Sequence, residues 1–122
     1  MTNIFNPQGA PQVKATFYFG RNILGEYGVD SNTFAAFLSD SVTPHFPGFN
    51  YIVALGSWNG ETEQCFILSF LMADSVANRG QCDTIAQQYC DRFSQDAVAL
   101  EFTACQFAFI STPTQRAWLR DK

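Results

Sequence analysis

The stretch that decides the fold spans residues 51–72 and reads Y-I-V-A-L-G-S-W-N-G-E-T-E-Q-C-F-I-L-S-F-L-M. Asn59 and Gly60 separate two apolar runs. The Asn-Gly dipeptide favours a two-residue hairpin turn because both of its positions readily adopt positive φ. The sequence therefore predicts two antiparallel strands, 51–58 and 61–72.

The segment before this hairpin predicts a strand followed by a helix. Residues 13–19, V-K-A-T-F-Y-F, alternate in the pattern of a half-buried strand. Asp30 or Ser31 can cap the helix, and Pro44 and Pro47 end it. Its buried side chains are expected at helical spacing: Phe34, Phe37, Leu38 and Val42. The glycine-containing loop at 20–28 lacks the phosphate-loop motifs, so a turn or flexible lid is favoured there.

The segment after the hairpin predicts a second helix and a fourth strand. Gly80 interrupts the sequence, and Asp83 can cap the helix. Its buried stripe is expected to contain Ile85, Tyr89 and Phe93. Residues 97–102 predict a strand that can continue through a bulge near Thr103 and Ala104.

The predicted order β-α-β-β-α-β is that of an α+β, ferredoxin-like sandwich, with a four-stranded antiparallel sheet and both helices on one face. In this arrangement the first and third strands are central, the fourth flanks the first and the second flanks the third. We expect a single domain at 13–111, between a flexible N-terminal tail at 1–12 and a C-terminal tail at 112–122.

The composition excludes several classes of function. The 122 residues include 7 Lys and Arg against 11 Asp and Glu, for a net charge of −4. This balance argues against nucleic acid and favours a neutral or cationic small molecule. No apolar run is long enough to span a membrane and no signal peptide is visible, so we expect a cytoplasmic protein. Only 15% of residues are charged, which favours a homo-oligomer.

No cofactor or metal is predicted from the sequence. The four cysteines have no C-x-x-C spacing and are expected to be reduced thiols in or beside the predicted elements. His45 is the only histidine, which makes a zinc site improbable.

Strand parity indicates a candidate site on the face of the sheet away from the helices. Across the Asn-Gly turn, Trp58 lies opposite Glu61, and Glu63 shares their face. Tyr18 and Glu101 are expected on the same face of the other strands. Three carboxylates and two aromatic side chains on one face fit either a ligand site or a subunit interface. The opposite face is expected to lie under the helices, with Val53, Leu55, Phe66, Leu68 and Phe70.

Residues 86–98, A-Q-Q-Y-C-D-R-F-S-Q-D-A-V, resemble the phage-encoded S-adenosylmethionine lyases, which were long called SAM hydrolases. The matching positions are Ala86, Cys90, Phe93, Gln95, Asp96 and Val98. The hairpin also resembles that family, with a Gly-x-aromatic run and then a Glu that opens the third strand, as Glu63 does here.

A second resemblance covers most of residues 17–110. The motifs F-x-F-G, F-L-x-x-x-V-T-P-x-F-P, G-x-W and Y-x-x-R-F-x-Q are similar to those of an uncharacterised bacterial family that is often exported. No activity is assigned to that family.

The lyase resemblance implies a homotrimer whose active sites lie between subunits, and if the chain is phage-encoded it implies the host cytoplasm. It implies cleavage of S-adenosylmethionine, or action on another adenosine derivative. Glu63 would hold the substrate's ammonium group, with Glu101 as a second carboxylate and Glu61 as a weaker stand-in. Tyr18 and Trp58 would pack on the adenine or the sulfonium. Trp58 replaces a family tyrosine whose hydroxyl Tyr51 could supply, although Tyr51 has core parity.

Two alternatives stay open. The protein could bind and sequester a nucleotide-derived molecule, such as a host immune signal, without cleaving it. Arg21, Arg79 and Arg92 would then be candidate contacts. The protein could instead be an oligomeric interaction module, whose open face serves only subunit contact.

Overall fold

The structure, a computed structural model, describes residues 12–23 and 26–107. The predicted tails therefore lie almost entirely outside the described residues. In chain order the elements are β1 (Gln12–Gly20), β2 (Asn22–Ile23), β3 (Glu26–Tyr27), α1 (Ser31–Phe37), the π-helical turn η1 (Leu38–Val42), β4 (Asn50–Trp58), β5 (Glu61–Ala73), α2 (Val76–Phe93) and β6 (Ala99–Ala104).

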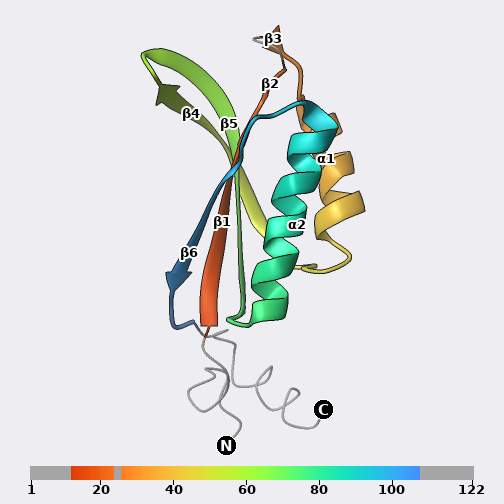
Figure 1. The fold of residues 1–122 in the computed structure, drawn as a ribbon, viewed down its shortest axis with the longest axis vertical. Helices are drawn as coiled ribbons and strands as arrows, with labels where there is room; N and C mark the ends of the chain where they lie inside the picture. Colours follow the sequence, from red (N-terminus) through yellow and green to blue (C-terminus); the bar gives the residue numbers. More distant parts are fainter. Residues whose placement is uncertain (1–11, 24–25, 108–122) are drawn as a thin grey trace, which may run out of the picture.

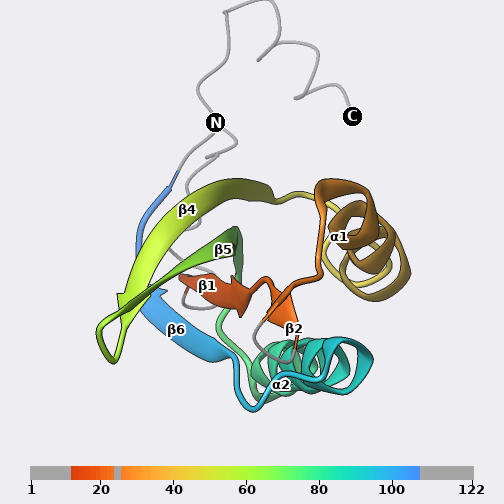
Figure 2. The same cartoon turned by 90° about the horizontal axis from the view of Figure 1, so that it is seen from above.

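The main sheet has the strand order β4-β5-β1-β6, and all of its neighbouring strands are antiparallel. Both helices lie on one side of this sheet (Figures 1 and 2). The predicted fold class and strand order are confirmed. The predicted first, second, third and fourth strands correspond to β1, β4, β5 and β6.

The hairpin turn has the predicted geometry. Asn59 and Gly60 have φ values of 51° and 81°, which both lie in the left-handed region that this turn requires. Trp58 pairs with Glu61 across the turn, and Gly56 pairs with Glu63. The register predicted from parity is therefore confirmed.

The core between the sheet and the helices is mainly aromatic. Phe19, Phe34, Phe37, Phe66 and Tyr89 are all fully buried. The rings of Phe34 and Phe66 are stacked with centroids 4.0 Å apart, and those of Phe19 and Tyr89 are 4.3 Å apart. The large phenylalanine content of the sequence is thus largely used to join β1 and β5 to α1 and α2.

The helices cover less of the sheet than the sequence predicts. Phe66, Leu68 and Phe70 are buried as expected, but Val53 and Leu55 remain 54% and 71% exposed. The β4–β5 hairpin curves away from the helical layer (Figure 1), so these two side chains have the core parity without a helix above them. The expectation that they lie under the helices is wrong.

Helix α1 begins as predicted. The Asp30 side chain accepts a hydrogen bond from the Thr33 backbone N–H at 2.7 Å, which satisfies one of the free donors of the first turn. This bond lowers the pKa of the Asp30 carboxyl. The helix continues into η1 and buries the four expected apolar side chains, Phe34, Phe37, Leu38 and Val42.

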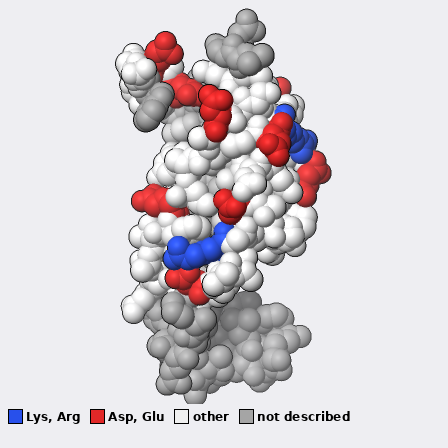
Figure 3. Space-filling model, in the orientation of Figure 1, with Lys and Arg blue, Asp and Glu red and all other residues white. Residues whose placement is uncertain are grey.

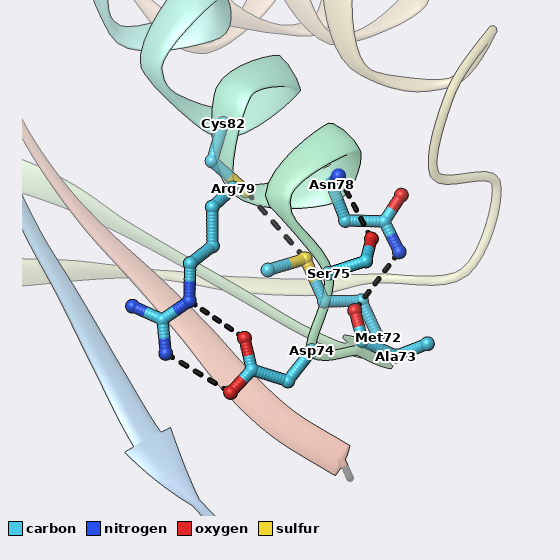
Figure 4. Close-up of polar contacts among 7 residues, drawn as sticks. All are labelled: Met72, Ala73, Asp74, Ser75, Asn78, Arg79 and Cys82. Carbon is cyan, nitrogen blue, oxygen red and sulfur yellow. Dashed lines mark hydrogen bonds and ion pairs between the residues drawn. The ribbon is translucent and has the colours of Figure 1, made fainter. Parts of the chain in front are cut away.

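Helix α2 begins earlier than predicted. Ser75 is the cap, and its hydroxyl accepts a hydrogen bond from the Asn78 N–H at 3.1 Å (Figure 4). The Asn78 side chain donates to the Ala73 carbonyl at 2.9 Å, and Arg79 pairs with Asp74 at 2.6 Å. These contacts fasten the first turn to the end of β5.

The expectation that Gly80 interrupts the chain and Asp83 caps the helix is therefore wrong. Gly80 lies inside α2, where the capped first turn and the packing of Cys82 against Met72, at 3.7 Å between sulfurs, offset its low helix propensity. The predicted bulge is also absent from the described part of β6, since Lys14 pairs with Thr103 and Val13 with Ala104. The glycine loop contains the short β2–β3 hairpin.

Candidate functional site

The open face of the sheet, away from the helices, is organised in rows by the strand register. One row consists of Ile52, Ile67, Tyr18 and Ala99. The next row toward the start of β1 consists of Asn50, Ser69, Thr16 and Glu101. The next row toward the end of β1 consists of Ala54, Cys65 and Gly20. Glu63 comes next along β5 on the same face, opposite Gly56. The strands therefore carry Tyr18, Glu63 and Glu101 to one surface.

Tyr18 and Glu101 form a polar pair in the middle of this face. The Tyr18 hydroxyl donates a hydrogen bond to Glu101 Oε1 at 3.0 Å. This bond raises the pKa of Tyr18, because the neighbouring carboxylate disfavours the phenolate. The Tyr18 side chain is 38% exposed, so its ring is available for contact.

Glu63 lies beside Gln95 at the end of β1. A methyl group in place of the Gly20 hydrogen would stand 2.7 Å from Glu63 Oε1 and 2.9 Å from Gln95 Oε1. Gln95 Nε2 is occupied, since it donates to the carbonyls of Asn22 at 2.6 Å and Phe93 at 3.0 Å. Two oxygen acceptors, one of them a carboxylate, thus meet over Gly20.

The backbone at Gly20 is fixed from the helical side. The Tyr89 hydroxyl donates to the Gly20 carbonyl at 2.5 Å, and burial raises the pKa of Tyr89. Glu63 raises that pKa further, while Arg21 lowers it. The residues of two sequence motifs, F-x-F-G and Y-x-x-R-F-x-Q, therefore come together at this point.

Arg21 lies on the helical side of the sheet and not on the open face. It is 4% exposed, and its guanidinium lies 4.3 Å from the centroid of the Phe66 ring. It donates to the Val29 carbonyl at 2.9 Å and to Gln64 Oε1 at 3.0 Å. These bonds join the loop before α1 to β5.

The other arginines considered from the sequence also have protein partners. Arg79 pairs with Asp74 and lies over the Phe102 ring, with 4.3 Å to the centroid. Arg92 pairs with Asp40 at 3.0 Å.

The structure does not bring all six predicted site residues together. The Glu63 carboxylate lies at Gly20, whereas Glu101 pairs with Thr16, and these two positions in β1 are about 13 Å apart along the strand at about 3.3 Å per residue. Glu61 is exposed at the turn. Tyr51 is on the other face, with its ring 5.2 Å from Phe34. The backbone of Trp58 is in β4, but its side chain is outside the described part.

A cavity of about 410 Å³ opens on this face, and three predicted site residues, Tyr18, Tyr51 and Glu101, line it together with Lys14. A larger cavity, of about 800 Å³, lies toward the other end of β1, between the loop after η1 and the end of β5. Its described lining includes Lys14 and His45 and no carboxylate. Lys14 lines both cavities, but only the smaller cavity also has a carboxylate, Glu101, in its described lining. The smaller cavity is therefore better suited to a cation, and Glu63 lies outside its lining.

The distribution of charged side chains near the hairpin also favours a cation. In Figure 3 the acidic side chains over the β4–β5 hairpin have no basic side chain beside them.

Among residues 12–23 and 26–107, no group of three or more His, Cys, Asp and Glu is arranged to hold a metal ion. Within the same residues, no helix is both long and apolar enough to cross a membrane.

Sequence reasoning did not assign Gln95, Gly20 and Tyr89 to the site. Gln95 appeared only as a motif position. Tyr89 appeared as a motif position and as a buried residue of the second helix, and Gly20 as the end of F-x-F-G and the start of the loop. The motif Y-x-x-R-F-x-Q was the available signal, because its spacing of six residues places both Tyr89 and Gln95 near the end of α2. Their contact with β1 depends on tertiary packing.

The chain belongs to the DUF3574 family of proteins of unknown function, whose family model matches residues 14–109. A search of the curated proteins finds no match.

Among solved structures, the fold is similar to that of a phage SAM lyase. The apo form has a TM-score of 0.58 at 12% identity, over 87% of this chain and 94% of that chain. The form in complex with S-methyl-5'-thioadenosine has a TM-score of 0.57 at 12% identity, over 84% and 92%. Both resemblances predicted from sequence motifs are confirmed, and at this identity the structural likeness establishes the fold alone.

Proposed function

We propose that the open face binds an adenosine-containing small molecule through its cationic part, and specifically that the protein is an S-adenosylmethionine lyase. One observation carries the proposal. The Glu63 carboxylate lies over Gly20 without a hydrogen-bond donor from the other described residues, in a fold similar to that of a phage SAM lyase. A half-buried carboxylate of this kind suits a positively charged ligand group.

The proposed reaction is an intramolecular displacement. The substrate's carboxylate oxygen attacks the methylene carbon attached to sulfur, the carbon–sulfur bond breaks, and its electron pair stays on the sulfur. The sulfonium becomes the neutral thioether of methylthioadenosine, and the remaining part closes to homoserine lactone. No cofactor or protein nucleophile is needed, so the protein acts by folding the substrate into attack geometry and excluding water.

Different residues of the candidate site have different roles in this proposed reaction. Glu63 holds the substrate's ammonium group, which fixes the amino-acid end of the substrate. Tyr18 presents an exposed ring to the adenine or the sulfonium, and Glu101 fixes that ring through the 3.0 Å hydrogen bond. Trp58 and Glu61, at the paired end of the hairpin, complete the proposed binding residues.

A second subunit completes the site in this proposal. Ile52, Val53 and Leu55 on edge strand β4 are 59%, 54% and 71% exposed. Exposed apolar side chains on an edge strand are typical of a subunit contact, which supports a homo-oligomer. The lyase resemblance favours a trimer. A monomer in sedimentation analysis would contradict this part of the proposal.

Binding without cleavage is the second candidate, and the position of Tyr51 favours it. The family's hairpin tyrosine is replaced by Trp58, and the Tyr51 ring packs 5.2 Å from Phe34 and 6.1 Å from Phe66 on the helical side. The Tyr51 ring therefore packs against the helical side, although Tyr51 also contributes to the lining of the smaller cavity. The protein would then sequester the ligand intact.

The test compares Glu63→Gln with Asp91→Asn, which changes the net charge equally on an exposed part of α2. Each protein is incubated with S-adenosylmethionine, and methylthioadenosine and homoserine lactone are measured by mass spectrometry. We expect Glu63→Gln to lower kcat/KM at least about tenfold, because a hydrogen bond to a charged group contributes about 1.5–3 kcal/mol. Asp91→Asn should match the parent.

Equal turnover by the parent and Glu63→Gln would exclude the assigned role of Glu63. If the parent forms no product but retains intact S-adenosylmethionine on a desalting column, sequestration replaces catalysis. Neither product nor retention would contradict both candidates.

A further inference from the structure

The arrangement of Gln95 beside Glu63 carries an inference about which adenosine derivatives the site accepts. Gln95 follows directly after the end of α2, and Ser94 at the C-cap has a φ of 52° in the left-handed region. This reversal turns the chain back toward β1. The Gln95 side chain is half-buried there, next to Gly20 and the loop after it.

The orientation of the Gln95 amide is fixed by its neighbours. Its Nε2 donates to two backbone carbonyls, those of Asn22 and Phe93. The opposite amide orientation would place an oxygen against both carbonyls and lose both hydrogen bonds. The Gln95 oxygen must therefore face Gly20 and Glu63, and it acts there only as an acceptor.

Gly20 lets both acceptors come close to the backbone of β1, because a β-carbon at residue 20 would clash with them. Glu63 Oε1 and Gln95 Oε1 are each within 2.9 Å of the position that a β-carbon at residue 20 would occupy. No hydrogen bond from another described residue reaches either oxygen. A ligand group that binds both oxygens must therefore carry several N–H donors and preferably a positive charge.

We propose that Gln95 and Glu63 together form a receptor for a primary ammonium group, with Gln95 as the residue that sets specificity. This inference rests on the proposed adenosine-ligand function and adds a selection rule to it. The site should prefer adenosine derivatives whose side chain ends in a protonated amine over those without one. A carboxylate or phosphate at the same position would meet two acceptors and be repelled.

The test measures two ligands that share the thioadenosine part. S-adenosylhomocysteine has the amino-acid end with its ammonium group and lacks the sulfonium leaving group, whereas S-methyl-5'-thioadenosine lacks the amine. Calorimetry on the parent protein should give at least about tenfold tighter binding for the first ligand. Gln95→Leu should remove most of this ratio while leaving the affinity for the second ligand within about twofold.

Two further variants separate recognition from folding. Gly20→Ala keeps the backbone carbonyls that accept from Gln95 Nε2 but adds a methyl group that clashes with both oxygens, so it should displace them and reduce the same ratio. Gln88→Leu makes the identical exchange at an exposed position of α2 and should keep the ratio of the parent. A purely structural role for Gln95 would weaken both ligands alike.

The outcomes distinguish this inference from the proposed function. If neither ligand binds, both the proposed function and the proposed ammonium receptor are contradicted. Equal affinity of the parent for both ligands, or an unchanged ratio in both Gln95→Leu and Gly20→Ala, would overturn the receptor alone. A high ratio without any cleavage of S-adenosylmethionine would support the receptor and favour sequestration.

Discussion

The two faces of the main sheet differ sharply, although the same strands build both. In β1, Phe17 and Phe19 point to the helices and are fully buried, while Tyr18 between them is 38% exposed. One face thus supplies the hydrophobic burial that stabilises the fold. No helix or strand of the described residues lies over the other face, which carries the polar pair and the acceptors of the candidate site. Stability and ligand recognition should therefore respond to different substitutions.

The β4–β5 hairpin shows where this division ends. Phe66 and Leu55 share the same face, yet Phe66 is fully buried and Leu55 is 71% exposed. The helices reach the first residue and not the second. A side chain that faces the helical side of the sheet is therefore buried only where a helix lies above it.

The largest expected effect is on the covered face. Phe19→Ala should lower the free energy of unfolding by about 3–5 kcal/mol, the usual range when a buried aromatic ring is removed. Phe19 contacts the rings of Phe34, Phe37 and Tyr89, so the cavity cannot close easily. Denaturant unfolding measures this change. A loss of under about 1 kcal/mol would show that the aromatic cluster is not the stabilising core.

A much smaller effect is expected at the uncovered end of the same face. Leu55→Ser should change the unfolding free energy by less than about 0.5 kcal/mol in the monomeric state. At concentrations where subunits associate, the same substitution should weaken association, which sedimentation at several concentrations measures. A loss as large as that of Phe19→Ala under dissociating conditions would mean that a covering layer exists over Leu55.

The smallest effect at neutral pH is expected on the open face. Tyr18→Phe should leave stability at pH 7 within about 0.5 kcal/mol, because the hydrogen bond to Glu101 is exposed. The folded-state pKa of Tyr18 is raised above 10.0, so the contribution of its hydroxyl is complete below pH 10 and is lost as the pH rises through the folded value. The parent should therefore lose more stability than Tyr18→Phe between pH 9 and 11.5. Parallel curves would contradict the Tyr18–Glu101 contact.

Local chemistry made much of the fold predictable. The Asn-Gly turn, the alternation in β1 and the cap at Asp30 each specify structure through neighbouring residues, and all three are present. The start of α2 was missed because Gly80 weakens the local signal, while the contacts of Arg79 with Asp74 and of Cys82 with Met72 fasten the start of the helix to the end of β5. The exposure of Leu55 depends on where the helices end, which strand alternation does not encode.

The candidate site was predictable only in part for the same reason. Parity places Glu63, Tyr18 and Glu101 on one face, and the register agrees. It does not give their separation along the strands. Gln95 reaches Glu63 only because the chain reverses at Ser94 and α2 packs across β1, and both features arise from tertiary structure.

The central claim is that the open face near Glu63 binds an adenosine derivative. The most direct measurement is an amide chemical-shift map by NMR during titration with S-adenosylhomocysteine. We predict the largest shifts at Gly20, Glu63, Cys65 and Gln95, with smaller shifts at Tyr18. Shifts confined to the larger cavity near His45 and Phe49, or no shifts at all, would contradict the account.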